Sequence, residues 1–135
     1  MWYSSLIDVK EIPMYEVTIK KSFSAAHLLK EIGGKCEALH GHNFLAEVSV
    51  ASDTLNGEGL LIDFRTVKRW TEEVLQTLDH TYLNELDFFQ GRNPSSEAIA
   101  LYLYERISEK AMGANVTLSR VTVWESENSC VTYRP

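Results

Sequence analysis

Apolar and polar residues alternate along two stretches in the first third of the chain. From Tyr15 the apolar positions recur at every second residue as far as His27, and the same alternation returns from His40 to Val50. A period of two is typical of a strand that buries one face and exposes the other. The pattern therefore predicts two strands, and it allows a bulge or bend at Lys21, where a charge interrupts the apolar row.

Two later stretches have the spacing of three and four residues that indicates an amphipathic helix. The first helix is expected from about Phe64 to Leu78, after Asp63, which suits an N-cap. Its apolar face would carry Phe64, Val67, Trp70, Val74, Leu75 and Leu78. The second helix is expected to start with Pro94 at its first position and to stop near Gly113.

Two stretches rich in Val and Thr, 118–125 and 129–133, close the chain and predict a final pair of strands. The order β-β-α-α-β-β predicts an α+β domain with two helices on one face of a four-stranded antiparallel sheet. We expect one domain over residues 14–135, with 1–13 as an N-terminal extension. Because both sheet edges need covering, we also expect a homo-oligomer.

Composition and charge restrict the partners. The net charge of −6 disfavours nucleic acid, which is bound through clustered Lys and Arg, and an anionic substrate would need a local positive charge. No stretch approaches the roughly 20 apolar residues that span a membrane. The start of the chain lacks the pattern of a secretory signal, so we expect a cytoplasmic protein without a membrane partner.

Three of the four histidines have spacing that suits a metal site. His40 and His42 lie two residues apart on a predicted strand, so both rings project from one face. His27 ends the preceding strand with the same parity, and antiparallel pairing would bring it to the same point. Three neutral imidazoles suit Zn²⁺ and leave one coordination position open, as in catalytic sites. The alternative, ordinary packed or surface histidines, stays open on spacing alone.

Several other residues could contribute to catalysis. Cys36 lies four residues before His40, and a thiolate there needs a cation or base close by. Cys130 is expected to pack as a small apolar residue. Asp79 could orient the ring of His80, although a helix-end Asp beside a surface His is the alternative.

Two further sets of polar residues are candidates for binding. Glu125 ends a strand, where its carboxylate could accept hydrogen bonds from a guanidine-like N–H edge or could simply be exposed. Ser95, Ser96 and Glu97 could simply form the first turn of a helix, where an acidic residue suits the dipole.

Six motifs follow one another along the chain: FSAAH at 23–27, CEALHGHNF at 36–44, IDF at 62–64, LDHTYLN at 78–84, NPSSE at 93–97 and VWES at 123–126. Together they resemble the 6-pyruvoyl-tetrahydropterin synthase family, which includes the bacterial 6-carboxy-tetrahydropterin synthases of queuosine biosynthesis. The resemblance runs from about Met14 to Tyr133. It implies the tunnelling fold and an oligomeric barrel, commonly a hexamer of two stacked trimers, with active sites at subunit interfaces.

The resemblance also implies roles for individual residues. The implied zinc ligands are His27, His40 and His42. The implied catalytic residues are Cys36, Asp79 and His80. The implied pterin-binding residues are Glu125, Ser95, Ser96 and Glu97.

The activity that the resemblance implies is the zinc-dependent conversion of 7,8-dihydroneopterin triphosphate into 6-carboxy-5,6,7,8-tetrahydropterin, with release of acetaldehyde and triphosphate. The spacing C-x-x-x-H-G-H resembles the bacterial queuosine type. Glu37, directly after Cys36, resembles a subgroup that cleaves dihydroneopterin to 6-hydroxymethyl-7,8-dihydropterin for folate synthesis, as an alternative or second activity. A non-catalytic pterin- or zinc-binding module is the third hypothesis, and the presence of Cys36, Asp79 and His80 argues against it.

Overall fold

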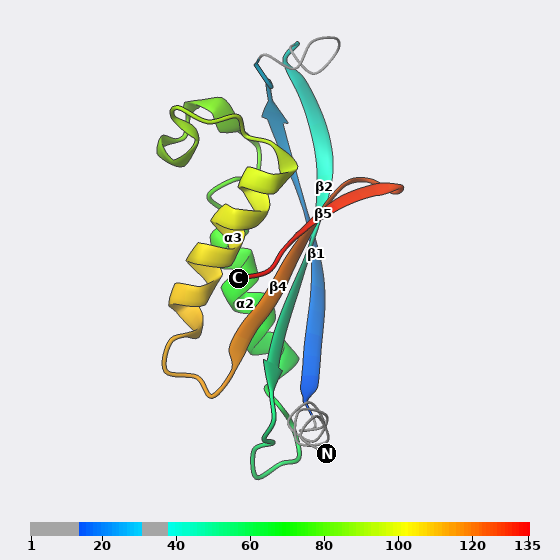
Figure 1. Ribbon diagram of the computed structural model, residues 1–135, viewed down its shortest axis with the longest axis vertical. Coiled ribbons are helices and arrows are strands. Elements are labelled where there is room, and N and C mark those ends of the chain that lie inside the picture. The colour runs from blue at the N-terminus through cyan, green and yellow to red at the C-terminus, as the bar shows by residue number, and fades with distance from the viewer. Residues whose placement is uncertain (1–13, 31–37) are drawn as a thin grey trace, which may run out of the picture.

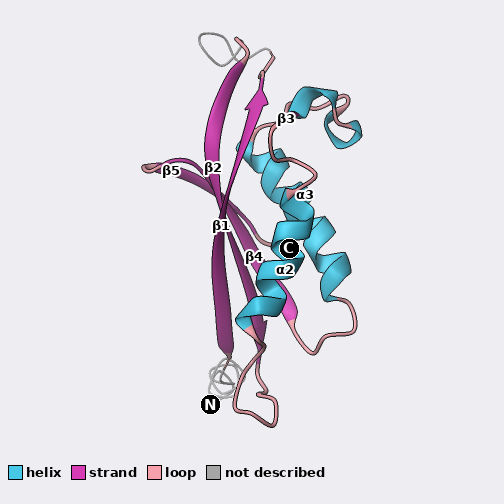
Figure 2. Cartoon of the chain, turned by 180° about the vertical axis from the view of Figure 1, so that it is seen from behind, coloured by secondary structure: helices cyan, strands magenta, loops and turns pink. Residues whose placement is uncertain are grey.

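The computed structural model describes residues 14–30 and 38–135, and it places two helices on one face of a twisted sheet (Figures 1 and 2). The strands are β1 (Tyr15–His27), β2 (His40–Ser52), β3 (Thr81–Tyr82), β4 (Thr117–Ser126) and β5 (Ser129–Tyr133). The helices are α2 (Phe64–Leu75) and α3 (Ser96–Ala111), with the short 3-10 turns η2 (Leu83–Glu85) and η3 (Asp87–Phe89) between them. The predicted α+β class is confirmed. None of the described helices is long and apolar enough to cross a membrane.

The sheet has the order β3-β1-β2-β4-β5. The four predicted strands pair antiparallel, as expected, but the sheet is mixed and five-stranded because β3 pairs parallel to the end of β1. This pairing joins Ala25 to Thr81 and Ala26 to Tyr82. A strand of two residues has no periodicity, so the sequence pattern missed it. The pairing fixes the segment around residue 80 beside the last residues of β1.

The strands β1 and β2 pair without interruption along their whole length, so the bulge that the sequence allowed at Lys21 is not present. The Nζ atom of Lys21 lies 3.4 Å from Oε1 of Glu72 in α2, which explains a charged residue on the helix side of the strand. The irregularity lies instead between Ser49 and Val50, where β2 pairs with β4.

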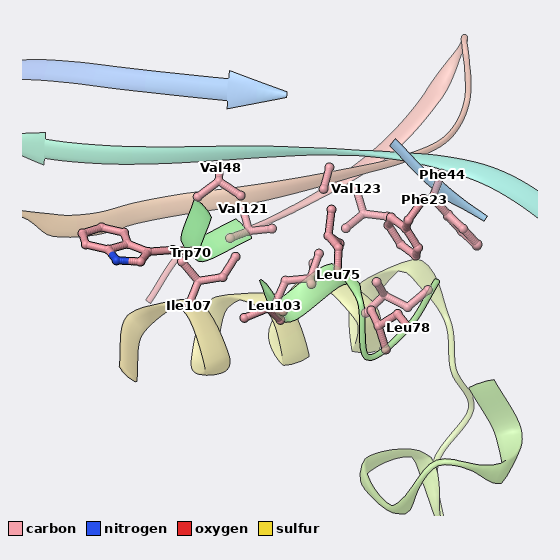
Figure 3. Packing of buried hydrophobic residues seen from close by; sticks show 14 of the residues in the cluster. Phe23, Phe44, Val48, Trp70, Leu75, Leu78, Leu103, Ile107, Val121 and Val123 are labelled. Atoms are coloured by element: carbon pink, nitrogen blue, oxygen red, sulfur yellow. The ribbon is translucent and has the colours of Figure 1, made fainter. Parts of the chain in front are cut away.

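The core lies between the sheet and the two helices (Figure 3). Leu103 and Ile107 of α3 have no exposed surface, and neither do Val48 and Val121 of the sheet facing them. This burial of apolar area against the sheet is the main force that holds the helices in place.

The apolar face predicted for α2 is partly wrong. Phe64 is 59% exposed, and Leu78, although fully buried, lies beyond the end of the helix at Leu75. At this end the backbone N–H groups of Thr77 and Leu78 bond to the carbonyls three residues back, so the α-helix gives way to a tighter turn. Leu78 therefore enters the core from the turn that leads to His80.

The start of α3 also differs from the prediction. Ser95 is the N-cap, and its Oγ accepts a 3.2 Å hydrogen bond from the backbone N–H of Ala98. Pro94 therefore precedes the cap and is not the first helical residue. Serine is among the favoured N-cap residues, and this preference decides the boundary. The carbonyl of Pro94 is thereby left outside the helix.

Cys130 lies exposed on β5, so the expectation that it packs as an apolar residue is wrong. Residues 1–13 lie outside the described part of the chain, and the domain boundary at residue 14 stays a prediction.

Replacing Leu103 with Ala should lower the free energy of unfolding by about 3 kcal/mol, because the truncation leaves a cavity in the core. Urea denaturation at a fixed protein concentration measures the loss. The control is Met112→Ala, since Met112 is 80% exposed at the end of the same helix and should change stability by less than about 0.5 kcal/mol. Equal losses for the two variants would contradict this packing.

Candidate metal centre and active site

The three predicted metal ligands meet where β1 ends and β2 begins. In the antiparallel register His27 stands opposite His40, and Ala25 stands opposite His42. Directly opposed residues project from the same face of a sheet. The candidate ligand atoms of the three histidines all lie within 4.8 Å of one another. The structure thus brings together the residues that parity alone had paired.

The cluster is buried on one side and open on the other. His27 has no exposed surface, whereas His40 and His42 are half-buried. The ring centroids lie 4.5 Å apart for His27 and His40 and 4.7 Å apart for His40 and His42. The ring of Phe44 lies 5.6 Å from His27 and forms an apolar wall next to the core. A ligand can therefore approach from the side of His40 and His42.

The protonation state of His27 follows from its hydrogen bond. Its Nδ1 lies 2.8 Å from the carbonyl oxygen of Pro94, which can only accept, so Nδ1 carries the proton and Nε2 keeps a lone pair. Burial is the main cause that lowers the pKa of His27, and nearby His40 lowers it further. Its Nε2 is buried without a hydrogen-bond partner among the described residues. A buried lone pair without a partner is costly, and a metal ion would satisfy it.

His40 is oriented in the same way. Its Nδ1 lies 2.7 Å from the carbonyl oxygen of Ala38, which again can only accept a hydrogen bond. The Nε2 atoms of His27 and His40 therefore both remain available as ligands. Backbone carbonyls that hold the second ring nitrogen are common partners of metal-binding histidines.

Glu125 lies at the same cluster. Its Oε1 is 3.5 Å from Nε2 of His27 and 3.7 Å from Nε2 of His42. Because Nε2 of His27 carries no proton, this nitrogen and the carboxylate oxygen face each other as two electron donors. A cation near them would remove the repulsion. The donor atoms of this cluster therefore fit a divalent metal ion.

Asp79 and His80 form the contact that the sequence only suggested. The Nδ1 atom of His80 lies 3.1 Å from Oδ2 of Asp79, and the backbone N–H of Ser24 donates a 2.8 Å hydrogen bond to Oδ1. The pKa of Asp79 is lowered, first by the N–H of Ser24 and then by His80. The carboxylate is thus held in its charged form and fixes the ring of His80.

The backbone of His80 is strained. Its φ angle is 58°, the one positive value for a non-glycine residue in the described part of the chain. Its backbone N–H donates a 2.6 Å hydrogen bond to the carbonyl of Ser24, which helps to hold this conformation. The side chain is 82% exposed, and it lines an open groove of about 460 Å³ together with His42. Strain of this kind is often found at functional sites.

The remaining predicted residues lie either at the start of α3 or outside the described part of the chain. Ser95 caps α3, Ser96 is buried and Glu97 is exposed, so the three form the first turn of the helix beside Pro94. Their contact with a pterin stays a prediction. Cys36 and Glu37 lie outside the described residues.

Sequence reasoning missed two asparagines that position the segment after His27. The side-chain amide of Asn84 donates to the carbonyl of Leu28 and accepts from its N–H, both at 2.9 Å. Asn93 makes the same two contacts with Lys30, at 2.8 and 2.9 Å. Both asparagines occur in the quoted motifs LDHTYLN and NPSSE, which was the available signal. The two side-chain amides thus supply Leu28 and Lys30 with backbone hydrogen bonds of the kind that a neighbouring strand would give.

Known proteins with similar sequences are named as pterin enzymes. A protein of Synechocystis named 6-carboxy-5,6,7,8-tetrahydropterin synthase is 38% identical, with 83% of this chain and 87% of that protein covered. A protein of Pyrococcus furiosus named dihydroneopterin monophosphate aldolase is 37% identical, with 81% and 88% covered.

The solved structure of Caenorhabditis elegans 6-pyruvoyl tetrahydropterin synthase superimposes with a TM-score of 0.81 at 29% identity, covering 91% of this chain and 96% of that one. The family model for 6-pyruvoyl tetrahydropterin synthase matches residues 16–135. Fold, motifs and family match agree, and the chain belongs to the 6-pyruvoyl tetrahydropterin synthase family.

Proposed function

We propose that this protein is a zinc-dependent enzyme that converts 7,8-dihydroneopterin triphosphate and water into 6-carboxy-5,6,7,8-tetrahydropterin, acetaldehyde and triphosphate. The observation that carries the proposal is the convergence of His27, His40 and His42, with one buried nitrogen that has no partner among the described residues. The relative from Synechocystis that is named for the product supports it.

His27, His40 and His42 would hold the zinc ion. Three neutral imidazoles are a common ligand set of catalytic zinc, which keeps a further position for water or substrate. Bound there, zinc would act as a Lewis acid toward the hydroxyl groups of the substrate side chain. The partly exposed side of the cluster, at His40 and His42, is where these groups would enter.

Other side chains of the protein would move protons and hold the substrate. Cys36, as thiolate, would take a proton from the side-chain carbon next to the pterin ring. His80, oriented by Asp79, would serve as the partner acid or base. Glu125 would accept hydrogen bonds from the N–H edge of the pterin, next to the histidine cluster. Ser95 to Glu97 would line the pterin pocket.

A homo-oligomer would complete this site. The ring of His80 is 82% exposed in the single chain, so it is available to a neighbouring subunit. We propose a hexamer of two trimers, in which each pair of Asp79 and His80 transfers protons in a site at a subunit interface.

A second candidate is cleavage of dihydroneopterin, or a phosphate of it, to 6-hydroxymethyl-7,8-dihydropterin. The relative from Pyrococcus furiosus named dihydroneopterin monophosphate aldolase favours this activity. Glu37, next to Cys36 in the sequence, is the residue that would support it.

The His27→Ala variant should bind zinc more weakly than the wild type, by at least the roughly 10–100-fold that loss of an outer partner of a metal ligand costs. Competition with a chromophoric chelator measures the affinity. The control is His80→Ala, which should keep wild-type affinity because His80 is not part of the cluster. Equal zinc affinity for His27→Ala and the wild type would exclude His27 as a ligand.

The Cys36→Ala variant should release acetaldehyde from dihydroneopterin triphosphate about 10²–10⁴-fold more slowly, because a group that transfers a proton is lost. The matched control is Cys130→Ala, since Cys130 is exposed on β5 and should keep the wild-type rate. A rate for Cys36→Ala within a few-fold of the wild type would remove Cys36 from this role.

The second candidate has its own assay. If it holds, unphosphorylated dihydroneopterin should yield 6-hydroxymethyl-7,8-dihydropterin, and Glu37→Gln should abolish this product while acetaldehyde release from the triphosphate persists. Glu58→Gln, which changes an exposed glutamate in the turn before α2, is the control. Chromatography of the pterin products decides, and absence of the hydroxymethyl product with Glu37 intact rejects the activity.

A further inference from the structure

A pocket of about 500 Å³ lies on the side of β3 and η3, and the segments that line it adjoin the backbone that holds His27. Three segments line it, namely residues 28–30 after β1, residues 82–84 and residues 89–93. Two of these segments adjoin His27 through the backbone or through one hydrogen bond. Leu28 is its neighbour in sequence, and Asn93 precedes Pro94, whose carbonyl holds the ring of His27. A ligand bound at the cluster could thus extend into this pocket.

The walls of the pocket are held by hydrogen bonds. The amides of Asn84 and Asn93 fix the backbone of Leu28 and Lys30, each through a pair of bonds. The side chain of Gln90 donates to the carbonyl of Asn84 at 2.8 Å. These contacts between separate segments indicate a preformed pocket, as is usual for small-molecule sites.

The described residues that line the pocket carry positive charge, against the net charge of −6 for the whole chain. Lys30 and Arg92 line it from two different segments, and none of the described residues that line it is acidic. The guanidinium of Arg92 lies 4.2 Å from the centre of the Phe88 ring, a contact that restricts its position. Within the described part of the chain, neither cation forms an ion pair with a carboxylate.

Arg65 is an example of a cation that is already paired with a carboxylate. Arg65 lies 2.7 Å from Oδ2 of Asp63 at the start of α2. Its charge is therefore largely compensated locally, and Arg65 is not among the residues that line the pocket. This contrast makes Arg65 a suitable control for charge removal.

We propose that Lys30 and Arg92 bind the phosphate chain of the substrate. This inference rests on the proposed function, because it takes the pterin side chain to be held at the histidine cluster. The phosphates are attached to the last carbon of that three-carbon side chain, so they lie beyond the hydroxyl groups. A lysine and an arginine on a polar wall are the usual partners of phosphate oxygens. Lys30 and Arg92 would therefore favour dihydroneopterin triphosphate over unphosphorylated dihydroneopterin.

Direct binding of inorganic triphosphate tests the subsite without any turnover. Calorimetry should show binding to the wild-type protein, and Lys30→Gln and Arg92→Gln should each weaken it roughly tenfold, as expected for a lost charged hydrogen bond. Arg65→Gln should bind as the wild type does. The same series in the His27→Ala background removes any contribution of bound metal. Equal binding by the wild type and the double variant, or no binding by the wild type, overturns the proposal.

Kinetics separate this inference from the proposed function. The double variant should have a KM for dihydroneopterin triphosphate raised by roughly 100-fold, the product of two such losses, with little change in kcat. The inhibition constant of unphosphorylated dihydroneopterin should stay unchanged, since it lacks the phosphates. An equal rise in both constants overturns phosphate recognition. Triphosphate binding that depends on both residues, without turnover of any pterin, would reject the proposed function and retain the subsite.

Discussion

The pairing register of β1 and β2 is the constraint on which the site depends. It sets His27 opposite His40 and places His42 two residues further along the same face. A shift of one residue would turn the side chains of one strand to the opposite face. The register is fixed by the apolar residues that continue the same two rows into the core, such as Phe23 opposite Phe44. The candidate metal centre thus continues the two rows of core residues that stabilise the fold.

Placing a histidine at the end of a buried row has a cost, because its ring nitrogens lose water. One nitrogen of His27 is satisfied by the carbonyl of Pro94, which lies outside α3 because Ser95 serves as the cap. The other nitrogen has no hydrogen-bond partner among the described residues. The folded chain therefore holds His27 in one protonation state and one ring orientation, with Nε2 available to bind a cation.

The sequence predicted the parts of the structure that depend on local periodicity. The facing rows of β1 and β2, and with them the convergence of three histidines, follow from a period of two. The proximity of Glu125 to His27 and His42 did not follow, because it depends on the register in which β4 pairs with β2, far along the chain. The support from Pro94, Asn84 and Asn93 was missed for a similar reason, since their partners lie more than fifty residues away.

Element boundaries were predicted less well than element types. The helix α2 ends where the backbone bonds shorten to a three-residue spacing, and α3 begins at the Ser95 cap, and neither feature is visible in the apolar periodicity. Cys36 and Glu37 lie outside the described residues, so their predicted roles rest on the motif alone.

The hydrogen bonds between Ser24 and the segment of Asp79 and His80 have a mechanical consequence. Ser24 lies three residues before His27 on β1, so one strand carries a candidate metal ligand and also anchors the pair of Asp79 and His80. Within one subunit, the short stretch of β1 between Ser24 and His27 therefore helps to set the spacing between the three histidines and the pair of Asp79 and His80.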